Sequence, residues 1–263
     1  LNYSDADRSN DRVVDYYIGN VVDSLPNRSI ILSAQWDLWC SGFWYCQKVE
    51  NRRNDVILIE KELFRRTWYP RQLKRWHPEL FTKIHSQVHD YESLLEKFEN
   101  NSEQFNRNSY EVAAIQMHWN KILKAIVDSN LKERPIYATL DIMQTEPDLD
   151  KHYQAVPEGF VFRLHPKNID VEQSQRNQLL ANEKFLDNIN ESKTRLHNLM
   201  MDAVLANYIN TAAYAINKER RFEYAQQLID VVLRYSPKNI NALNLQQRLL
   251  HLKHQPTHTL SAP

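Results

Sequence analysis

Residues 29–69 decide the fold, and their sequence is SIILSAQWDLWCSGFWYCQKVENRRNDVILIEKELFRRTWY. Two short, continuous apolar runs lie in this stretch, at residues 30–32 and 56–59. Such runs are typical of strands that are buried on both faces of a sheet. The segment between them is long enough for one helix. The stretch therefore predicts two parallel strands joined by a crossover helix.

The flanking sequence predicts a three-layer α/β domain over residues 1–166, with a small, mainly parallel sheet of about four strands. A helix at residues 11–24 precedes the first strand. The crossover helix, 38–50, is expected to bury Trp39, Phe43, Cys46 and Val49. Two further strands are predicted at 136–140 and 160–164, separated by an acidic, proline-containing loop.

Residues 67–130 separate the second and third strands and are predicted to form a helical insertion on one sheet face. Apolar residues recur at helical spacing over 79–98 and 109–129. A shorter helix before them is expected to begin at Thr67, as its N-cap, and to stop near His77 because Pro78 follows.

Residues 171–252 contain no strand signal and predict an all-α region. Residues 207–239 resemble a tetratricopeptide repeat, in which Ala225 makes the tight contact between two helices and Pro237 and Asn239 end the second one. A lone repeat cannot bury its own apolar face, so it is expected to pack on a neighbour. Residues 253–263 are expected to form a disordered tail.

Composition argues against several classes of function. The 263 residues include 33 basic and 33 acidic side chains, so no excess charge favours a nucleic-acid partner. Three widely spaced glycines cannot form a glycine-rich phosphate loop, and no cofactor is expected. No stretch has the length and hydrophobicity of a membrane span or signal peptide. The chain begins with Leu1, and we expect it to be a piece of a longer protein.

Polar and aromatic residues follow the first two strands and form a candidate ligand patch, because the carboxyl ends of parallel strands meet at one sheet edge. They are Gln35, Trp36, Asp37, Glu60, Lys61, Arg65 and Arg66. A tryptophan beside a carboxylate suits a sugar, and the cations suit a phosphate. The alternative is structural: Asp37 caps a helix, the tryptophans pack in the core, and the charges form a solvated, salt-linked loop.

No recognisable catalytic or metal-binding set is present. His85 and His89 have the spacing that zinc sites use, but no glutamate accompanies them and no third ligand is in view. No serine lies in a nucleophile elbow, and Cys40 and Cys46 lack an activating context. The sequence therefore predicts no catalytic residues and no metal.

Several separated blocks resemble the soluble tail of a polytopic bacterial membrane family that is related to the eukaryotic endoplasmic-reticulum protein O-mannosyltransferases. The blocks are Ser24-Leu25-Pro26-Asn27, Gln35-Trp36-Asp37, Tyr45-Cys46-Gln47-Lys48-Val49-Glu50, Arg53-Asn54-Asp55-Val56, Trp68-Tyr69, Arg134-Pro135-Ile136-Tyr137 and Val156-Pro157-Glu158-Gly159-Phe160. Together they cover about residues 1–166. Asn54 departs from the proline that the family favours, and this chain has Gln35-Trp36-Asp37 where many members carry a Gly-Asp or Asn-Asp.

The resemblance implies a parent protein with a bundle of transmembrane helices that precedes this chain and carries the catalytic acid. The chain would then be a non-catalytic domain on the periplasmic or extracytoplasmic face, and its partner would be a polypeptide acceptor or another protein. Two alternatives remain: a free-standing α/β enzyme that binds a sugar or nucleotide at the strand ends, and a scaffold that acts only through its helical region.

Overall fold

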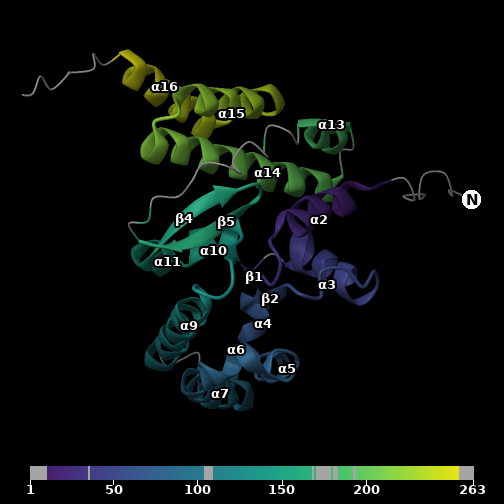
Figure 1. Cartoon of the computed structure of the whole chain (residues 1–263), viewed down its shortest axis with the longest axis vertical. Helices are drawn as coiled ribbons and strands as arrows, with labels where there is room; N and C mark the ends of the chain where they lie inside the picture. Colours follow the sequence, from purple (N-terminus) through teal and green to yellow (C-terminus); the bar gives the residue numbers. More distant parts are fainter. Residues whose placement is uncertain are drawn as a thin grey trace, which may run out of the picture. The chain divides into compact units, whose positions relative to one another are not determined.

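The computed structural model describes residues 11–34, 36–103, 109–167, 169, 179, 183–191 and 194–254 (Figure 1). The predicted tail lies outside these residues from position 255 onward. The chain forms two compact units. We call Ile18–Val156 with Val161–Glu172 the sheet unit, and Leu1–Tyr17, Pro157–Phe160 and Gln173–Pro263 the helical unit. The boundaries expected from the sequence, 1–166 and 171–252, stay a prediction.

A five-stranded mixed sheet forms the centre of the sheet unit, in the order β2-β1-β3-β5-β4. The strands are β1 (Ile30–Ser33), β2 (Ile57–Glu60), β3 (Ile136–Ala138), β4 (Tyr153–Glu158) and β5 (Val161–Pro166). β1 pairs in parallel with β2 and with β3, whereas β3 and β5 are antiparallel. The expected four strands were one too few.

The central βαβ prediction is confirmed. Every residue of β1 and β2 is buried, and Ile30 pairs with Ile57. The connection consists of the π-helical turn η1 (Trp36–Cys40) and helix α3 (Ser41–Lys48). Trp39, Phe43 and Cys46 are buried as predicted, but Val49 is 65% exposed because α3 has already ended.

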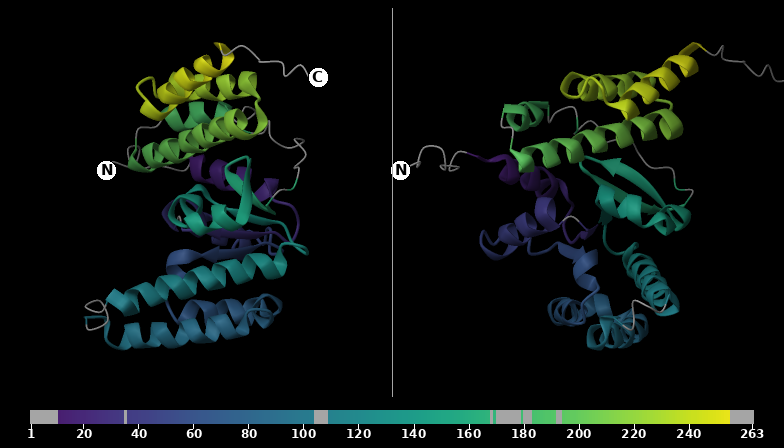
Figure 2. Two further views of the ribbon diagram at one scale, coloured as in Figure 1. Left: turned by 90° about the vertical axis from the view of Figure 1, so that its left-hand side faces the viewer. Right: turned by 180° about the vertical axis from the view of Figure 1, so that it is seen from behind.

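The predicted helical insertion is also present and begins directly after β2. Its helices are α4 (Lys61–Phe64), α5 (Trp68–Trp76), α6 (Pro78–Thr82), α7 (His85–Asn100) and α9 (Ser109–Asn130). The helix expected over 79–98 is in fact interrupted between α6 and α7. α7 and α9 lie side by side (Figure 2) and share one hydrophobic core with the sheet. Thr67 holds the N-cap position of α5 as predicted, but its side chain makes no capping hydrogen bond, and its hydroxyl donates to Glu99 Oε2 at 2.7 Å instead.

The segment predicted as an acidic loop before the last strand is mostly ordered structure. It contains α10 (Leu140–Thr145), α11 (Pro147–His152) and the edge strand β4. β4 includes Pro157, and proline in a strand is tolerated at a sheet edge. Gly159 has a φ of 63° in the turn between β4 and β5, a conformation that glycine adopts without strain.

The helical unit contains α13 (Glu183–Glu191), α14 (Arg195–Tyr214), η2 (Ala215–Glu219), α15 (Phe222–Tyr235) and α16 (Ile240–His254). The prediction that this region is helical is confirmed for the residues that are described. The rings of Tyr17, Phe160 and Phe185 form a cluster with centroids 5.7–6.3 Å apart. None of the helices in the described parts of the chain combines the length and apolar character that a membrane span requires.

Arg53 joins the turn before β2 to the segment before β1. Its guanidinium contacts Asp55 Oδ1 at 3.0 Å and donates to the carbonyl oxygens of Val22 and Pro26. Hydrogen bonds from Arg53 also hold the pKa of Asp55 below its ordinary value. Gln47 donates to the carbonyls of Arg53 and Val56, at 2.8 Å each. The blocks around Gln47 and Arg53 that carry the family resemblance therefore have a structural role.

Replacing Arg53 by lysine is expected to lower the free energy of unfolding by about 1–3 kcal/mol, because one ammonium cannot reproduce the forked contacts to two carbonyls and Asp55. Urea unfolding measures the change. The matched control is Arg52→Lys, since Arg52 forms exposed pairs with Asp23 and Glu50 and should lose only about 0–1 kcal/mol. Equal losses in the two variants would contradict the assigned role of Arg53.

Candidate functional site

Glu60 lies where β2 ends, as predicted, but its side chain serves the fold. Glu60 is fully buried and caps α4, with Oε2 accepting a hydrogen bond from the backbone N–H of Leu63. Its own backbone N–H donates to the hydroxyl of Tyr69 at 3.0 Å. Burial raises the pKa of the Glu60 carboxyl above its ordinary value. A carboxylate that is held in this way has a structural reason to be present.

A second carboxylate, Asp141, lies at the same edge of the sheet. It belongs to the first turn of α10, just after β3, and its Oδ2 accepts from the N–H of Ala34 at 2.7 Å. Burial raises the pKa of Asp141. Burial is also the largest cause of the raised pKa of the Cys40 thiol, and the charges of Glu60 and Asp141 raise that pKa further. The carboxyl ends of β1, β2 and β3 therefore meet around two carboxyl groups whose ionised forms are disfavoured.

Lys61 forms a buried ion pair with Glu146. The distance between Lys61 Nζ and Glu146 Oε1 is 2.5 Å, and the two side chains are 8% and 2% exposed. Lys61 Nζ also donates to the hydroxyl of Thr145 at 3.1 Å. Gln116, on α9, donates to the second oxygen of Glu146 at 3.3 Å. This pair ties α4 to α9 and to the junction of α10 and α11.

Of the other residues in the predicted patch, some lie outside the part of the chain that the structure describes and the rest make contacts with nearby side chains. Gln35 and the Asp37 side chain lie outside the described residues. The predicted capping role of Asp37 is wrong, because its backbone lies inside η1 and the N-cap position of α3 is held by Cys40. Trp36 is 44% exposed, and its ring meets that of Trp44 edge-on at 5.3 Å. Arg65 pairs with Glu62, and Arg66 lies over the ring of Phe98 at 5.9 Å. Whether these residues bind a ligand stays a prediction.

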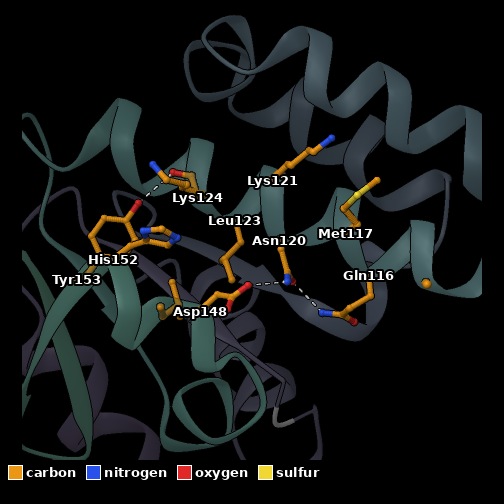
Figure 3. Close-up of a pocket in the computed structure, with 11 residues that line it drawn as sticks. Gln116, Met117, Asn120, Lys121, Leu123, Lys124, Asp148, His152 and Tyr153 are labelled. Carbon is orange, nitrogen blue, oxygen red and sulfur yellow. Dashed lines mark hydrogen bonds between the residues drawn. The ribbon is translucent and has the colours of Figure 1, made fainter.

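A groove with a cavity volume of about 610 Å³ lies between α9 and α11 (Figure 3). This volume is within the range of pockets that bind small molecules. The groove combines apolar residues with amides and charged side chains. The lining residues are Ala113, Gln116, Met117, Asn120, Lys121, Leu123, Lys124, Asp148, Leu149, His152 and Tyr153.

A chain of hydrogen bonds runs along this groove (Figure 3). Gln116 Nε2 donates to Asn120 Oδ1 at 2.9 Å, and Asn120 Nδ2 donates to Asp148 Oδ2 at 3.0 Å. Gln116 also contacts Glu146, the partner of Lys61, and accepts from Arg65 Nη2 at 3.4 Å. The polar network at the strand ends thus continues into the groove.

Sequence reasoning found Glu60, Lys61 and Arg65 but missed the residues that they meet. Glu146 and Asp141 lie in the segment that was predicted to be an acidic loop. Gln116 lies on a predicted long helix, and nothing in its local sequence distinguishes it from other polar residues there. Lys61 and Thr145 are 84 residues apart, and Ala34 and Asp141 are 107 apart. The acidic character of residues 141–150 was the one available signal.

The histidine pair and the two cysteines that the sequence singles out all lie within the described residues. The rings of His85 and His89 stack at 6.4 Å, and no group of three potential metal ligands occurs among the described residues. Burial raises the pKa of Cys40, and burial and the Glu50 charge raise that of Cys46 to about 11. Both thiols are therefore protonated at neutral pH, which disfavours nucleophilic chemistry.

Replacing Glu60 by glutamine is expected to raise the melting temperature by about 2–4 °C at neutral pH, an effect on the order of 1 kcal/mol. Because the folded pKa of Glu60 is raised, its stabilising contribution is complete below the unfolded pKa and is lost as the pH rises through the folded pKa. Glutamine removes this loss and keeps an acceptor for Leu63. Thermal melts from pH 4 to pH 7.5 should show the difference growing with pH. Exposed Glu103→Gln is the control; an E60Q effect independent of pH would contradict the reasoning.

Comparison with known proteins finds a partial match. Over 77 residues, 29% of this chain, the sequence is 34% identical to a Mus musculus protein named Protein O-mannosyl-transferase TMEM260. The matched segment spans 11% of the length of that mouse protein. No protein-family model matches the chain, and no solved structure matches it. The match supports a distant relation to a protein O-mannosyltransferase.

Proposed function

We propose that this chain is a non-catalytic, extracytoplasmic domain of a membrane protein that resembles glycosyltransferases, and that it presents an acceptor polypeptide or docks a protein partner. The similarity to the mouse protein O-mannosyltransferase supports the glycosyltransferase-like part of this proposal. The membrane part would be a helical bundle elsewhere in the parent protein.

The observation that carries the non-catalytic part is the internal use of the strand-end charges. Glu60 caps α4, Asp141 accepts from Ala34, and Lys61 is paired with Glu146. A catalytic acid or base must reach a substrate, either directly or through one water molecule. Glu60 is fully buried and Asp141 is half-buried, and both bind the backbone, so they are better suited to hold the strand ends together.

The helical unit would add a tetratricopeptide-like surface to a three-layer α/β domain. Ala225 is fully buried on α15, the helix that packs on α14, and α16 begins three residues after Pro237. These features agree with a small residue at a close helix contact and a proline that ends a repeat. Stacked helical pairs of this kind present surfaces to polypeptides.

Sugar transfer by the isolated chain is the direct test. The full chain is incubated with a lipid-linked mannose donor and acceptor peptides, and transfer is measured by mass spectrometry of the peptides. We expect no transfer above a reaction without protein. Robust transfer would refute the non-catalytic assignment and would favour a sugar-binding enzyme at the strand ends. In that event Trp36→Ala and Glu60→Gln should reduce transfer without loss of fold.

A further inference from the structure

We infer that the groove between α9 and α11 binds a polypeptide segment that carries an apolar side chain close to a carboxylate. This inference rests on the proposed function, because it assigns the polypeptide-binding role to one surface of the sheet unit. The argument comes from three features of the groove: its apolar surface, its positive charge and its fixed amides.

The apolar surface of the groove extends along one face of α9. Tyr110, Ala113 and Met117 recur at spacings of three and four residues, so they share a face. Met117 is 49% exposed and Tyr110 is 86% exposed. Methionine adapts its shape to a partner because its side chain is unbranched and polarisable. An exposed apolar strip that leads into a cavity is suited to an apolar side chain from a polypeptide.

The charge that is available in the groove is positive. Asp148 is already bound by Asn120 and by Lys151 Nζ, which lies 2.6 Å from its second oxygen. Lys124 pairs with Asp128. Lys121, in contrast, forms no ion pair with any residue that the structure describes, and it lies one helical turn beyond Met117 on the same face (Figure 3). A carboxylate on the ligand would complement Lys121.

The amides on the groove wall are held in fixed orientations. Asn120 accepts from Gln116 and donates to Asp148, so its side chain is positioned before any ligand arrives. Side-chain amides next to an apolar surface can bond the backbone N–H and C=O groups of a peptide. Preorganised groups lose less conformational entropy on binding, which favours binding of a peptide at this site.

A saccharide fits this groove less well than a peptide. The Tyr153 ring is buried, and its hydroxyl donates to Asp128 Oδ1 at 2.6 Å. Its face is therefore not a stacking platform for a sugar ring. The remaining ring in the groove is that of His152, which already meets Tyr153 at 6.2 Å.

Selection from a phage-displayed library of random 12-residue peptides on the immobilised full chain tests the inference. We expect enrichment of peptides with an apolar residue near Asp or Glu. Synthetic copies of the selected peptides are then measured by fluorescence polarisation against three variants. Met117→Glu and Lys121→Glu should each weaken binding about tenfold or more, equivalent to about 1.4 kcal/mol. The control Lys97→Glu, an exposed lysine on α7, should bind within about twofold of the unaltered chain.

Exchanging the charges of Lys121 and of the peptide's acidic residue tests whether these two groups contact each other. Peptides in which the acidic residue is changed to lysine should bind Lys121→Glu better than they bind the unaltered chain. The inference is wrong if no peptide is enriched, if the three variants bind alike, or if a mannose oligosaccharide binds with a Met117 dependence and the peptides do not. Circular dichroism verifies that each variant is folded. Because sugar transfer is assayed separately, failed peptide binding does not by itself refute the non-catalytic assignment.

Discussion

Replacing Lys61 by methionine is expected to lower the free energy of unfolding by about 3–5 kcal/mol, the usual cost of removing one partner from a buried ion pair. The change leaves the carboxylate of Glu146, whose side chain is 2% exposed, with one described hydrogen bond, from Gln116 at 3.3 Å. The buried carboxylate then lacks the cation that offset its desolvation. Urea unfolding at neutral pH, followed by circular dichroism, measures the loss.

The double variant Lys61→Met with Glu146→Leu separates the ion pair from simple packing. Two apolar side chains of similar volume remove both charges, and such replacements are often neutral or stabilising. We therefore expect the double variant to be more stable than Lys61→Met alone, by about 2 kcal/mol or more. A double variant with losses equal to the sum of the two single variants would show that Lys61 and Glu146 do not interact.

The same pair bears on the function of the predicted ligand patch. If the double variant folds and still binds the selected peptides, then Lys61 contributes to the fold and not to peptide recognition. If peptide binding is lost while stability is kept, the strand ends and the groove act as one site through Gln116. Gln116 donates hydrogen bonds to Glu146 and to Asn120, and these bonds could transmit a change at the strand ends to the groove.

The parts of the fold that could be predicted are those with a local signal. The runs at 30–32 and 56–59 predicted β1 and β2 because a buried parallel strand is apolar throughout. The gap between α6 and α7 could not be predicted, because Leu80, Ile84 and Val88 keep a helical spacing across it and all three are buried. At Ile84 the backbone has left the helix, with φ near −124°, yet its side chain still faces the core.

In each contact of the candidate site, one partner could be predicted from the sequence and the other could not. Glu60 and Lys61 follow a recognisable strand, so their place at the sheet edge could be inferred. Their partners depend on tertiary packing: Glu146 lies between two short helices, and Gln116 lies in the middle of α9. The groove itself arises where α11 packs near α9. Helix α11 was not predicted because its six residues are too few to show periodicity.

Replacing Phe64 by alanine is expected to lower the free energy of unfolding by about 3–5 kcal/mol and to loosen the helical insertion. Phe64 is fully buried at the end of α4, and its ring lies 5.3 Å from that of Trp119 and 6.0 Å from that of Tyr91. Alanine leaves a cavity between α4, α7 and α9, and it removes aromatic contacts that contribute beyond their buried area. Urea unfolding measures the global loss.

Hydrogen exchange distinguishes a local effect from a global one, with Phe43→Ala as the matched control. Phe43 is equally buried, but it lies on α3 and outside the core cluster that contains Phe64. Phe64→Ala should speed exchange most in α7 and α9, because opening of the insertion then costs less free energy. Similar exchange patterns in the two variants would contradict the assigned role of Phe64. Since α9 carries Met117, Asn120 and Lys121, loosening it should also weaken peptide binding without any change to the groove's own side chains.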